Sequence, residues 1–326
     1  MFTLSRRSEL VILGAMQRRR HQKSAAPHWG VLVNPKATSH SRSVVESITK
    51  EIKRRGGYYT LAEPDSSHDL LHQAQVMAGL IKDEVSPDEE RFGKITGLIA
   101  VGGDGTFNLV ARAAHDADLP VGIIPTGRFN NIARWLYGEL KPSAATAKVL
   151  EGNYRKVDVG IVGDRPFFGS IGLGLVPELA AALEGKRTPL LGIGWSRLGA
   201  QAAAKVKMQK TLLKVDAVKF DFEPIFLNVN LLPYSVGLPF SPVSIADDGL
   251  VEVLCDQRPL LGNYSSFVRQ IYKRNYLFGK EVCIYRGKSI LCQPTQGRIL
   301  YVDGELVKLQ TNSLDISLHG KQLMLL

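Results

Sequence analysis

The sequence places one acid within a run of glycines, Gly102-Gly103-Asp104-Gly105-Thr106, directly after an apolar segment and before one of helical period. Glycine lets backbone N–H groups converge on a phosphate chain without interference from Cβ atoms, and the N-terminus of the following helix adds partial positive charge. Asp104 would then coordinate Mg²⁺ or take a proton from an attacking hydroxyl, while Thr106 would cap the helix or donate to a phosphate. The pattern predicts a phosphate-binding loop; the alternative is a tight turn that holds no ligand.

The elements that must position this loop alternate between short apolar runs and longer amphipathic segments. Strands are expected at 30–33, 58–61, 95–101 and 121–124, with helices between them, one of which covers 67–82. Continuous apolar strands are typical of a parallel sheet that is covered by helices on both faces. Ligands of such sheets bind at the carboxyl ends of the strands, where Asn34, Asp104 and Gly127 all lie.

The pattern changes after about residue 153 to many short strands with few helices. Strands are expected at 155–162, 166–171, 215–222, 224–230, 250–255, 281–285, 289–293, 297–302 and 314–318, and helices near 177–184, 196–212 and 260–274. We therefore predict an α/β N-terminal domain with a parallel sheet and a β-rich, antiparallel, sandwich-like C-terminal domain. The expected boundaries are a basic extension at 1–28, a nucleotide-binding domain at 29–153 and an acceptor domain at 154–326, whose last strand could return to the first domain.

The charge, the apolar runs and the cysteine count limit the classes of protein to which this chain can belong. The formal charge of +10 and the isoelectric point near 9.5 favour an anionic partner, and no recognisable nucleic-acid-binding motif accompanies them. No apolar run approaches the ~20 residues that span a bilayer, so an integral membrane protein is not expected. The three cysteines lack the spacing of a zinc module, and their odd number argues against a disulfide scaffold.

Two basic segments could bind an anionic membrane surface. Residues 3–20 form a short basic amphipathic pattern, and residues 186–214 carry seven basic residues and no acid, interleaved with apolar ones. The alternatives are a solvated N-terminus in the first case and, in the second, a surface helix whose apolar side packs on the sheet. The sequence alone does not choose between them.

The glycine-rich pentapeptide in this setting resembles the diacylglycerol kinase catalytic domain family, which includes bacterial soluble lipid kinases and sphingosine kinases. The first strand with Asn34-Pro35 is similar to the first phosphate loop of that family, and the stretch 120–127 with Asn130 is similar to its second nucleotide-facing segment. Three acidic segments follow in the expected order, at 157–160, 247–253 and 303–305. The match covers about residues 29–326.

The resemblance implies a two-domain fold with ATP and Mg²⁺ in the cleft and transfer of phosphate to a lipid hydroxyl. It assigns the general base to Glu305, although turn chemistry alone would leave that acid solvated. A structural Mg²⁺, held in several members, would here use Asp248 and the carbonyls of Ile245 and Leu250. The nucleotide contacts implied by the resemblance correspond to Asn34, Gly102, Gly103, Asp104, Gly105, Thr106, Phe107 and Asn108.

Several positions depart from the family pattern. Arg128 replaces a phosphate-facing hydroxyl, Asn131 replaces an active-site carboxylate, and Leu109 replaces an acid in the helix after the glycine-rich loop. The Asn131 change removes a charge that could hold Mg²⁺, while Arg128 could stabilise the transferred phosphate directly. The first loop continues with residues 36–39, which contain no glycine.

These observations lead to a principal hypothesis and two alternatives. The principal one is a cytoplasmic, peripherally membrane-associated lipid kinase that uses ATP and Mg²⁺ and phosphorylates diacylglycerol or a related lipid, with homodimer formation left open. The first alternative is a nucleotide-binding or lipid-binding homologue that has lost efficient transfer. The second is a kinase of a soluble acceptor, since NAD kinases share the Gly-Gly-Asp-Gly-Thr signature.

Overall fold

The structure is a computed structural model that describes residues 26–34, 36, 39–84, 88–138, 141–184, 193–256, 270–271, 276–278 and 282–326. The basic helix expected at 3–20 lies outside the described residues, as do residues 186–192 of the second basic segment and most of the helix expected at 260–274. Within the described part of the chain, no helix is both long and apolar enough to cross a membrane.

The first sheet is mostly parallel. Its strands follow the order β2-β1-β3-β4-β18-β5, and only the outermost pair, β18 and β5, is antiparallel. Every residue of β1, β3 and β4 is buried, which explains why these strands have continuous apolar sequences. Their bounds are β1 His28–Val33, β2 Tyr58–Ala62, β3 Gly97–Gly102, β4 Val121–Pro125, β5 Arg155–Val157 and β18 Leu323–Leu325.

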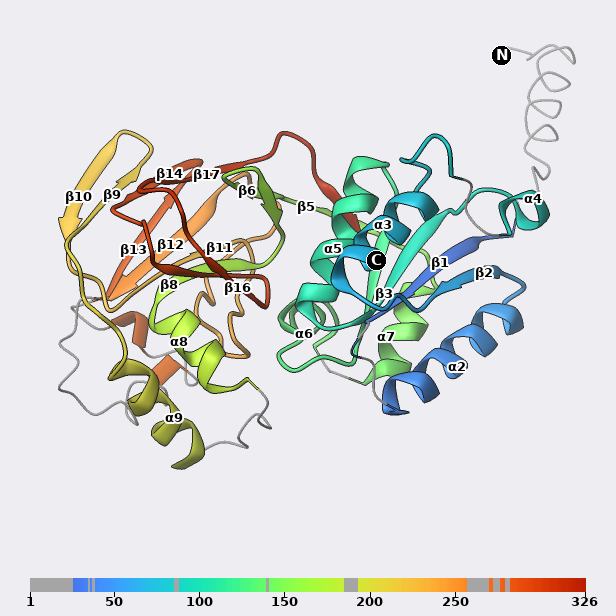
Figure 1. Cartoon of the computed structure of the whole chain (residues 1–326), viewed down its shortest axis with the longest axis horizontal. Coiled ribbons are helices and arrows are strands. Elements are labelled where there is room, and N and C mark those ends of the chain that lie inside the picture. Colours follow the sequence, from blue (N-terminus) through green and yellow to red (C-terminus); the bar gives the residue numbers. More distant parts are fainter. Residues whose placement is uncertain are drawn as a thin grey trace, which may run out of the picture.

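Helices cover this sheet on both faces, as expected for a parallel sheet (Figure 1). Helices α3 and α5 pack together against β1 and β3, while α2 and α7 pack together against β2 and β4. The bounds are α2 Ser39–Arg54, α3 Ser67–Met77, α4 Glu89–Phe92, α5 Asp104–Asp116, α6 Asn131–Tyr137 and α7 Pro142–Val149. The α/β arrangement expected for the N-terminal part is thus confirmed.

The remaining strands of the described chain form two antiparallel sheets, in the orders β10-β9-β14-β17-β6-β7 and β13-β12-β11-β8-β15-β16 (Figure 1). Their bounds are β6 Gly160–Val162, β7 Arg165–Phe167, β8 Ser170–Gly174, β9 Thr211–Val215, β10 Val218–Phe222, β11 Phe226–Asn230, β12 Val251–Asp256, β13 Val282–Gly287, β14 Ser289–Gln293, β15 Ile299–Val302, β16 Glu305–Lys308 and β17 Leu314–Leu318. This region confirms the β-rich C-terminal architecture.

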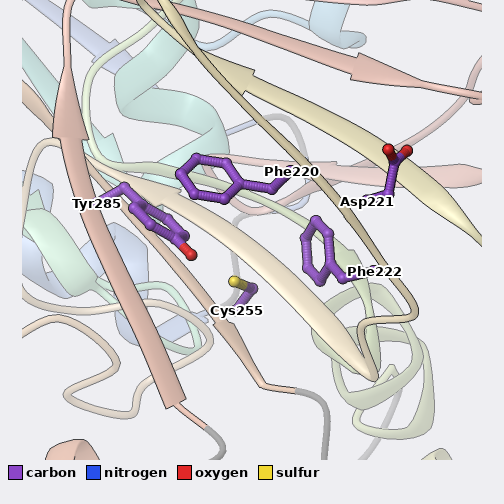
Figure 2. Close-up of a pocket in the computed structure, with 5 residues that line it drawn as sticks. All are labelled: Phe220, Asp221, Phe222, Cys255 and Tyr285. Carbon is purple, nitrogen blue, oxygen red and sulfur yellow. The ribbon is translucent and has the colours of Figure 1, made fainter.

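The two antiparallel sheets pack face to face, and aromatic side chains meet where their edge strands β10 and β13 approach. The rings of Phe220 and Tyr285 lie 4.1 Å apart between centroids. Phe222 and Cys255 complete a small cavity of about 150 Å³ beside them (Figure 2). The outer face of the third sheet is covered by α8 (Leu175–Ala182) and α9 (Ile193–Ala203), which enclose a second apolar cluster.

The structure differs from the sequence-based expectations at several element boundaries. The helix expected at 67–82 ends at Met77, because Gly79 adopts a positive φ of 71° that ends the helix. The strand expected at 155–162 divides between two sheets, since the backbone N–H of Asp158 donates to Ala246 O instead of to a strand neighbour. The loop expected at 83–90 contains the start of α4.

The helix expected at 196–212 is the largest difference. It ends at Ala203, and Thr211–Val215 forms β9, whose alternating burial fits a strand between β10 and β14. Helices α6 and α7 were not expected from the sequence.

Candidate active site

The loops that follow β3 and β4 approach each other closely at two glycines, Gly103 and Gly127. A Cβ added to Gly127 would lie 2.2 Å from the Cα of Gly103, and one added to Gly102 would lie 2.4 Å from Thr106 Oγ1. No side chain fits at either place, so bare backbone is required where both strands end and α5 begins. The start of this 13-residue helix therefore lies at the carboxyl edge of the sheet, as the sequence predicted.

Asn34, at the end of β1, is tied to the same corner. Its Nδ2 donates to Thr106 Oγ1 over 2.8 Å, and its Oδ1 accepts the backbone N–H of Lys36 over 2.7 Å. Its own backbone N–H donates to Val101 O. These bonds bring the loop after β1 beside the N-terminus of α5.

Asp104 holds a helix in place. Its Oδ2 accepts the backbone N–H of Asn131 and its Oδ1 accepts that of Ile132, so the carboxylate satisfies the first two amides of α6. Burial raises the pKa of Asp104 to about 6, against the opposing effect of these two hydrogen bonds. With three donors on its two oxygens, this acid has little capacity left for a metal ion.

Asn131 connects three separate parts of the chain. Its Nδ2 donates to Asp104 Oδ2 over 3.0 Å and to the hydroxyl of Tyr301 on β15 over 3.3 Å. Its Oδ1 accepts the backbone N–H of Gly237 over 2.9 Å. An amide is suited to this position because it donates to one neighbour and accepts from another, which a carboxylate cannot do.

A two-residue turn, Asp303-Gly304, joins β15 to β16. Both residues have positive φ, 43° and 99°, as a type I′ hairpin turn requires. The carboxylate of Asp303 accepts the backbone N–H groups of Phe168, Gly169 and Ser170 at 2.6 to 2.9 Å. It also accepts Asn108 Nδ2 over 3.0 Å, which fixes the hairpin to α5.

The hairpin delivers Glu305 to the glycine-rich corner. A Cβ added to Gly105 would lie 3.4 Å from Glu305 Cγ and 3.5 Å from its Oε1. The carboxylate forms an ion pair with Arg165, which comes from β7. The acid that the resemblance assigned as a base therefore lies beside the first turn of α5.

These groups line one cavity of about 350 Å³. The residues of the predicted site that line it are Asn34, Gly103, Asp104, Gly105, Thr106, Arg128 and Glu305. The other lining residues are Lys36, Ser67, Leu70, Leu109, Gly127, Phe129 and Gly304. Three predicted members lie away from it: Gly102 is the last residue of β3, Phe107 is buried edge-on against Phe168, and Asn108 is buried against Asp303. Sequence analysis missed Lys36 and Ser67, for which no pattern gave a signal.

The corner assigned to a structural Mg²⁺ holds a guanidinium group instead. Asp248 Oδ2 forms an ion pair with Arg286 Nη2, and its Oδ1 accepts the backbone N–H of Leu250 over 3.1 Å. Arg286 Nε also pairs with Glu252 over 2.8 Å, while the side chain of Ile245 is exposed. No group of three or more His, Cys, Asp or Glu suited to a metal occurs among the described residues. The residues at this corner do not fit a protein-held Mg²⁺.

Residues 193–203 of the second basic segment form the packed helix α9, and the segment ends in β9. The end of α9 buries Ala202 and Ala203 against α8, and Leu198 packs partly into the same cluster. The charged side chains of Arg197 and Lys205 are exposed. Contact of these charges with a membrane stays a prediction.

Comparisons with known proteins agree with this geometry. Residues 28–162 match the family model described as the diacylglycerol kinase catalytic domain. The chain is 24% identical over 227 residues to the diacylglycerol kinase of Staphylococcus carnosus (strain TM300), which covers 68% of this chain and 74% of that protein. It is 25% identical, also over 227 residues, to that of Staphylococcus aureus (strain bovine RF122 / ET3-1), covering 68% and 72%.

The fold is shared with a solved structure. A candidate diacylglycerol kinase from Bacillus anthracis str. Sterne superposes with a TM-score of 0.71 at 20% identity, over 93% of this chain and 98% of the other. The matched family segment contains the loops after β1, β3 and β4. Residues 28–162 of this chain therefore resemble the diacylglycerol kinase catalytic domain, and the sequence similarity to diacylglycerol kinases covers 68% of the chain.

Proposed function

We propose that this protein transfers the γ-phosphoryl group of ATP to a hydroxyl of diacylglycerol or a related lipid. The observation that carries the proposal is the position of Glu305, whose carboxylate lies within van der Waals distance of where a Gly105 side chain would begin. A potential base thus stands beside a helix N-terminus that suits phosphate. Phosphoryl transfer requires positioning and charge stabilisation more than covalent participation, and this arrangement supplies both.

The residues of the cavity fit the phosphates of a nucleotide. The glycine corner leaves backbone exposed at the start of α5, and Lys36 and Arg128 add positive charge to the cavity wall. When bound, ATP supplies the transferred group, and Mg²⁺ would enter with the phosphates, because the described residues form no metal cage. Asp104 keeps α6 and the Gly127 loop in place and has no assigned contact with the metal.

Glu305 would accept the proton of the acceptor hydroxyl while that oxygen bonds to phosphorus and the bond to the nucleoside diphosphate breaks. Arg128 and the first amides of α5 would stabilise the negative charge of the group in transfer. Arg128 is exposed and free to approach it, with its guanidinium 6.0 Å from the Phe129 ring.

The cavity wall favours an apolar acceptor. Leu70, Leu109 and Phe129 line it, and Phe129 also belongs to the apolar cluster beneath α8 and α9. Phe129 therefore links the cavity wall to that cluster, and α9 carries one exposed basic residue, Arg197. This combination supports a lipid acceptor presented at an anionic membrane surface over a soluble one.

Incubation with labelled ATP and mixed lipids that include diacylglycerol tests the proposal. We expect labelled lipid from the wild type and a loss of about 10²–10⁴-fold for Glu305→Gln, because the general base is removed. Glu151→Gln, an exposed glutamate outside the cavity, is the matched control and should retain activity. Absence of labelled lipid, transfer of label to NAD in a parallel incubation that contains NAD, or undiminished activity of Glu305→Gln would reject the proposal.

A further inference from the structure

Arg165 approaches Glu305 from outside the cavity. Its Nη2 forms an ion pair with Glu305 Oε2, and its side chain is 22% exposed, against 36% for that of Glu305. Its Nε is buried and has no hydrogen-bond partner among the described residues. A surface ion pair would leave that nitrogen to solvent, so the guanidinium is held here at a cost in desolvation.

The strand that carries Arg165 is fixed by the same contacts that fix the hairpin of Glu305. Pro166 O accepts Asn108 Nδ2 over 3.2 Å, and the next residues donate to Asp303, with Phe168 N at 2.6 Å. The rings of Phe107 and Phe168 meet edge to face, 6.0 Å between centroids. These contacts therefore hold the start of α5, strand β7 and the β15–β16 hairpin together around Glu305.

Two buried acids lie near Glu305. Asp104 on α5 lies close to the turn, with its Cβ 3.4 Å from where a Gly304 side chain would begin, and Asp303 is buried in the turn itself. Both acids oppose a further negative charge nearby. Lys36 and Arg128 also line the cavity, but among the described residues Arg165 alone forms an ion pair with Glu305.

We propose that Arg165 is the positioning residue for Glu305: it holds the carboxylate aimed at the start of α5, and so permits proton transfer from the acceptor hydroxyl. The proposal rests on the function proposed above. Arg165 does not line the cavity, so it would act through Glu305.

Steady-state kinetics of Arg165→Met and Arg165→Lys form the first test. Misplacement of a reacting group by about 1 Å costs on the order of 10²-fold. We expect kcat of Arg165→Met to fall by about that factor, with nucleotide binding unchanged within about twofold and partial recovery in Arg165→Lys. Arg155→Met is the matched control, because Arg155 also pairs with an acid, Asp247, but lies away from the cavity. Loss of nucleotide binding in parallel with kcat would overturn the positioning role.

The double variant Glu305→Gln/Arg165→Met separates positioning from general support of the fold. If Arg165 acts through Glu305, adding Arg165→Met to Glu305→Gln lowers kcat no further, whereas a structural role gives multiplied losses. Thermal unfolding of each variant accompanies this measurement, to confirm that it is folded.

A second readout requires no activity. The side-chain carboxyl signal of Glu305, assigned in carbon-13 NMR by its loss in Glu305→Gln, should differ in chemical shift between Arg165→Met and the wild type, because the variant loses the charged hydrogen-bond donor. If no lipid is phosphorylated while this shift occurs, the proposed function fails and the ion-pair role stands. If lipid is phosphorylated and the signal does not shift, the inference about Arg165 fails alone.

Discussion

Two turns of this molecule contain the dipeptide Asp-Gly, but the two aspartate side chains have different surroundings. At Asp303-Gly304 the carboxylate is buried and accepts three backbone N–H groups and one amide, with no cation in contact. At Asp248-Gly249 the carboxylate lies near the surface and pairs with Arg286, which also pairs with the buried Glu252. The first turn is held by dipoles and the second by a positive charge.

The comparison shows which interactions stabilise each turn. The donors to Asp303 come from the connection between β7 and β8, from the first residue of β8 and from α5, so its carboxylate joins segments that are far apart in sequence. The partner of Asp248 comes from one neighbouring strand, β13, and solvent reaches it. Asp303 thus fixes the position of Glu305, whereas Asp248 fastens the local start of β12.

Replacement of Asp303 should have the largest effect on stability. Asp303→Ala would leave three backbone N–H groups and Asn108 without their acceptor, each at a cost of about 1–3 kcal/mol, so we expect a loss above about 4 kcal/mol. Asp248→Ala removes a partly solvated pair and should cost about 1 kcal/mol or less. Urea unfolding measures both.

A second variant keeps this comparison decisive if Asp303→Ala does not fold. Asp303→Asn retains one acceptor oxygen and should fall between the wild type and Asp303→Ala, with a displaced hairpin and reduced lipid phosphorylation. Equal losses for the alanine variants of the two turns would contradict the distinction between them.

The burial of Asp104 should make the stability of the protein depend on pH, because it raises the pKa of this carboxyl. Burial raises its pKa from 3.8 to about 6, so the folded state binds its proton more tightly than the unfolded state does. The resulting stabilisation is complete below about pH 4 and is lost as pH rises through 6, by about 3 kcal/mol.

Urea unfolding between pH 4 and 7 measures this contribution when the wild type is compared with Asp104→Asn. The wild type should lose stability across the range relative to the variant, because Asn cannot ionise. A difference between the two that does not change with pH would contradict a raised pKa for Asp104.

The sequence was sufficient for the parts of the site that depend on local chemistry. Glycines after a buried strand predicted the corner at Gly102–Gly105, and strand order placed Asn34 and Gly127 beside it, since parallel strands end at one edge. The Asp-Gly pair before Glu305 is typical of the two-residue turn that the structure forms there, in which Asp303 accepts backbone N–H groups.

The remainder depends on partners that no local pattern reveals. Asp104 was expected to recruit a metal, but its donors, Asn131 and Ile132, begin a helix whose existence was not predicted. Arg165 stands in a strand of three residues, and its contact with Glu305 arises only when two sheets come together. The apolar spacing of β9 fitted a helix as well as a strand, and pairing with β10 and β14 decided it.

The smallest expected effect concerns Mg²⁺ at the turn of Asp248. Because Arg286 already provides the positive charge there, millimolar Mg²⁺ or EDTA without nucleotide should leave the melting temperature of the wild type unchanged.

The variant Arg286→Met should lose about 2 kcal/mol of stability, which is the scale of hydrogen bonds to charged groups, and the partial exposure of Arg286 limits the loss. It leaves the carboxylates of Asp248 and Glu252, oxygen ligands of the kind Mg²⁺ accepts, without their cation. We therefore expect Mg²⁺ to stabilise this variant by about 1 kcal/mol and Lys288→Met, at an exposed neighbouring position, not at all. If Mg²⁺ stabilises the wild type as much as Arg286→Met, the guanidinium does not take the place of a metal, and the contrast between the two turns loses its electrostatic basis.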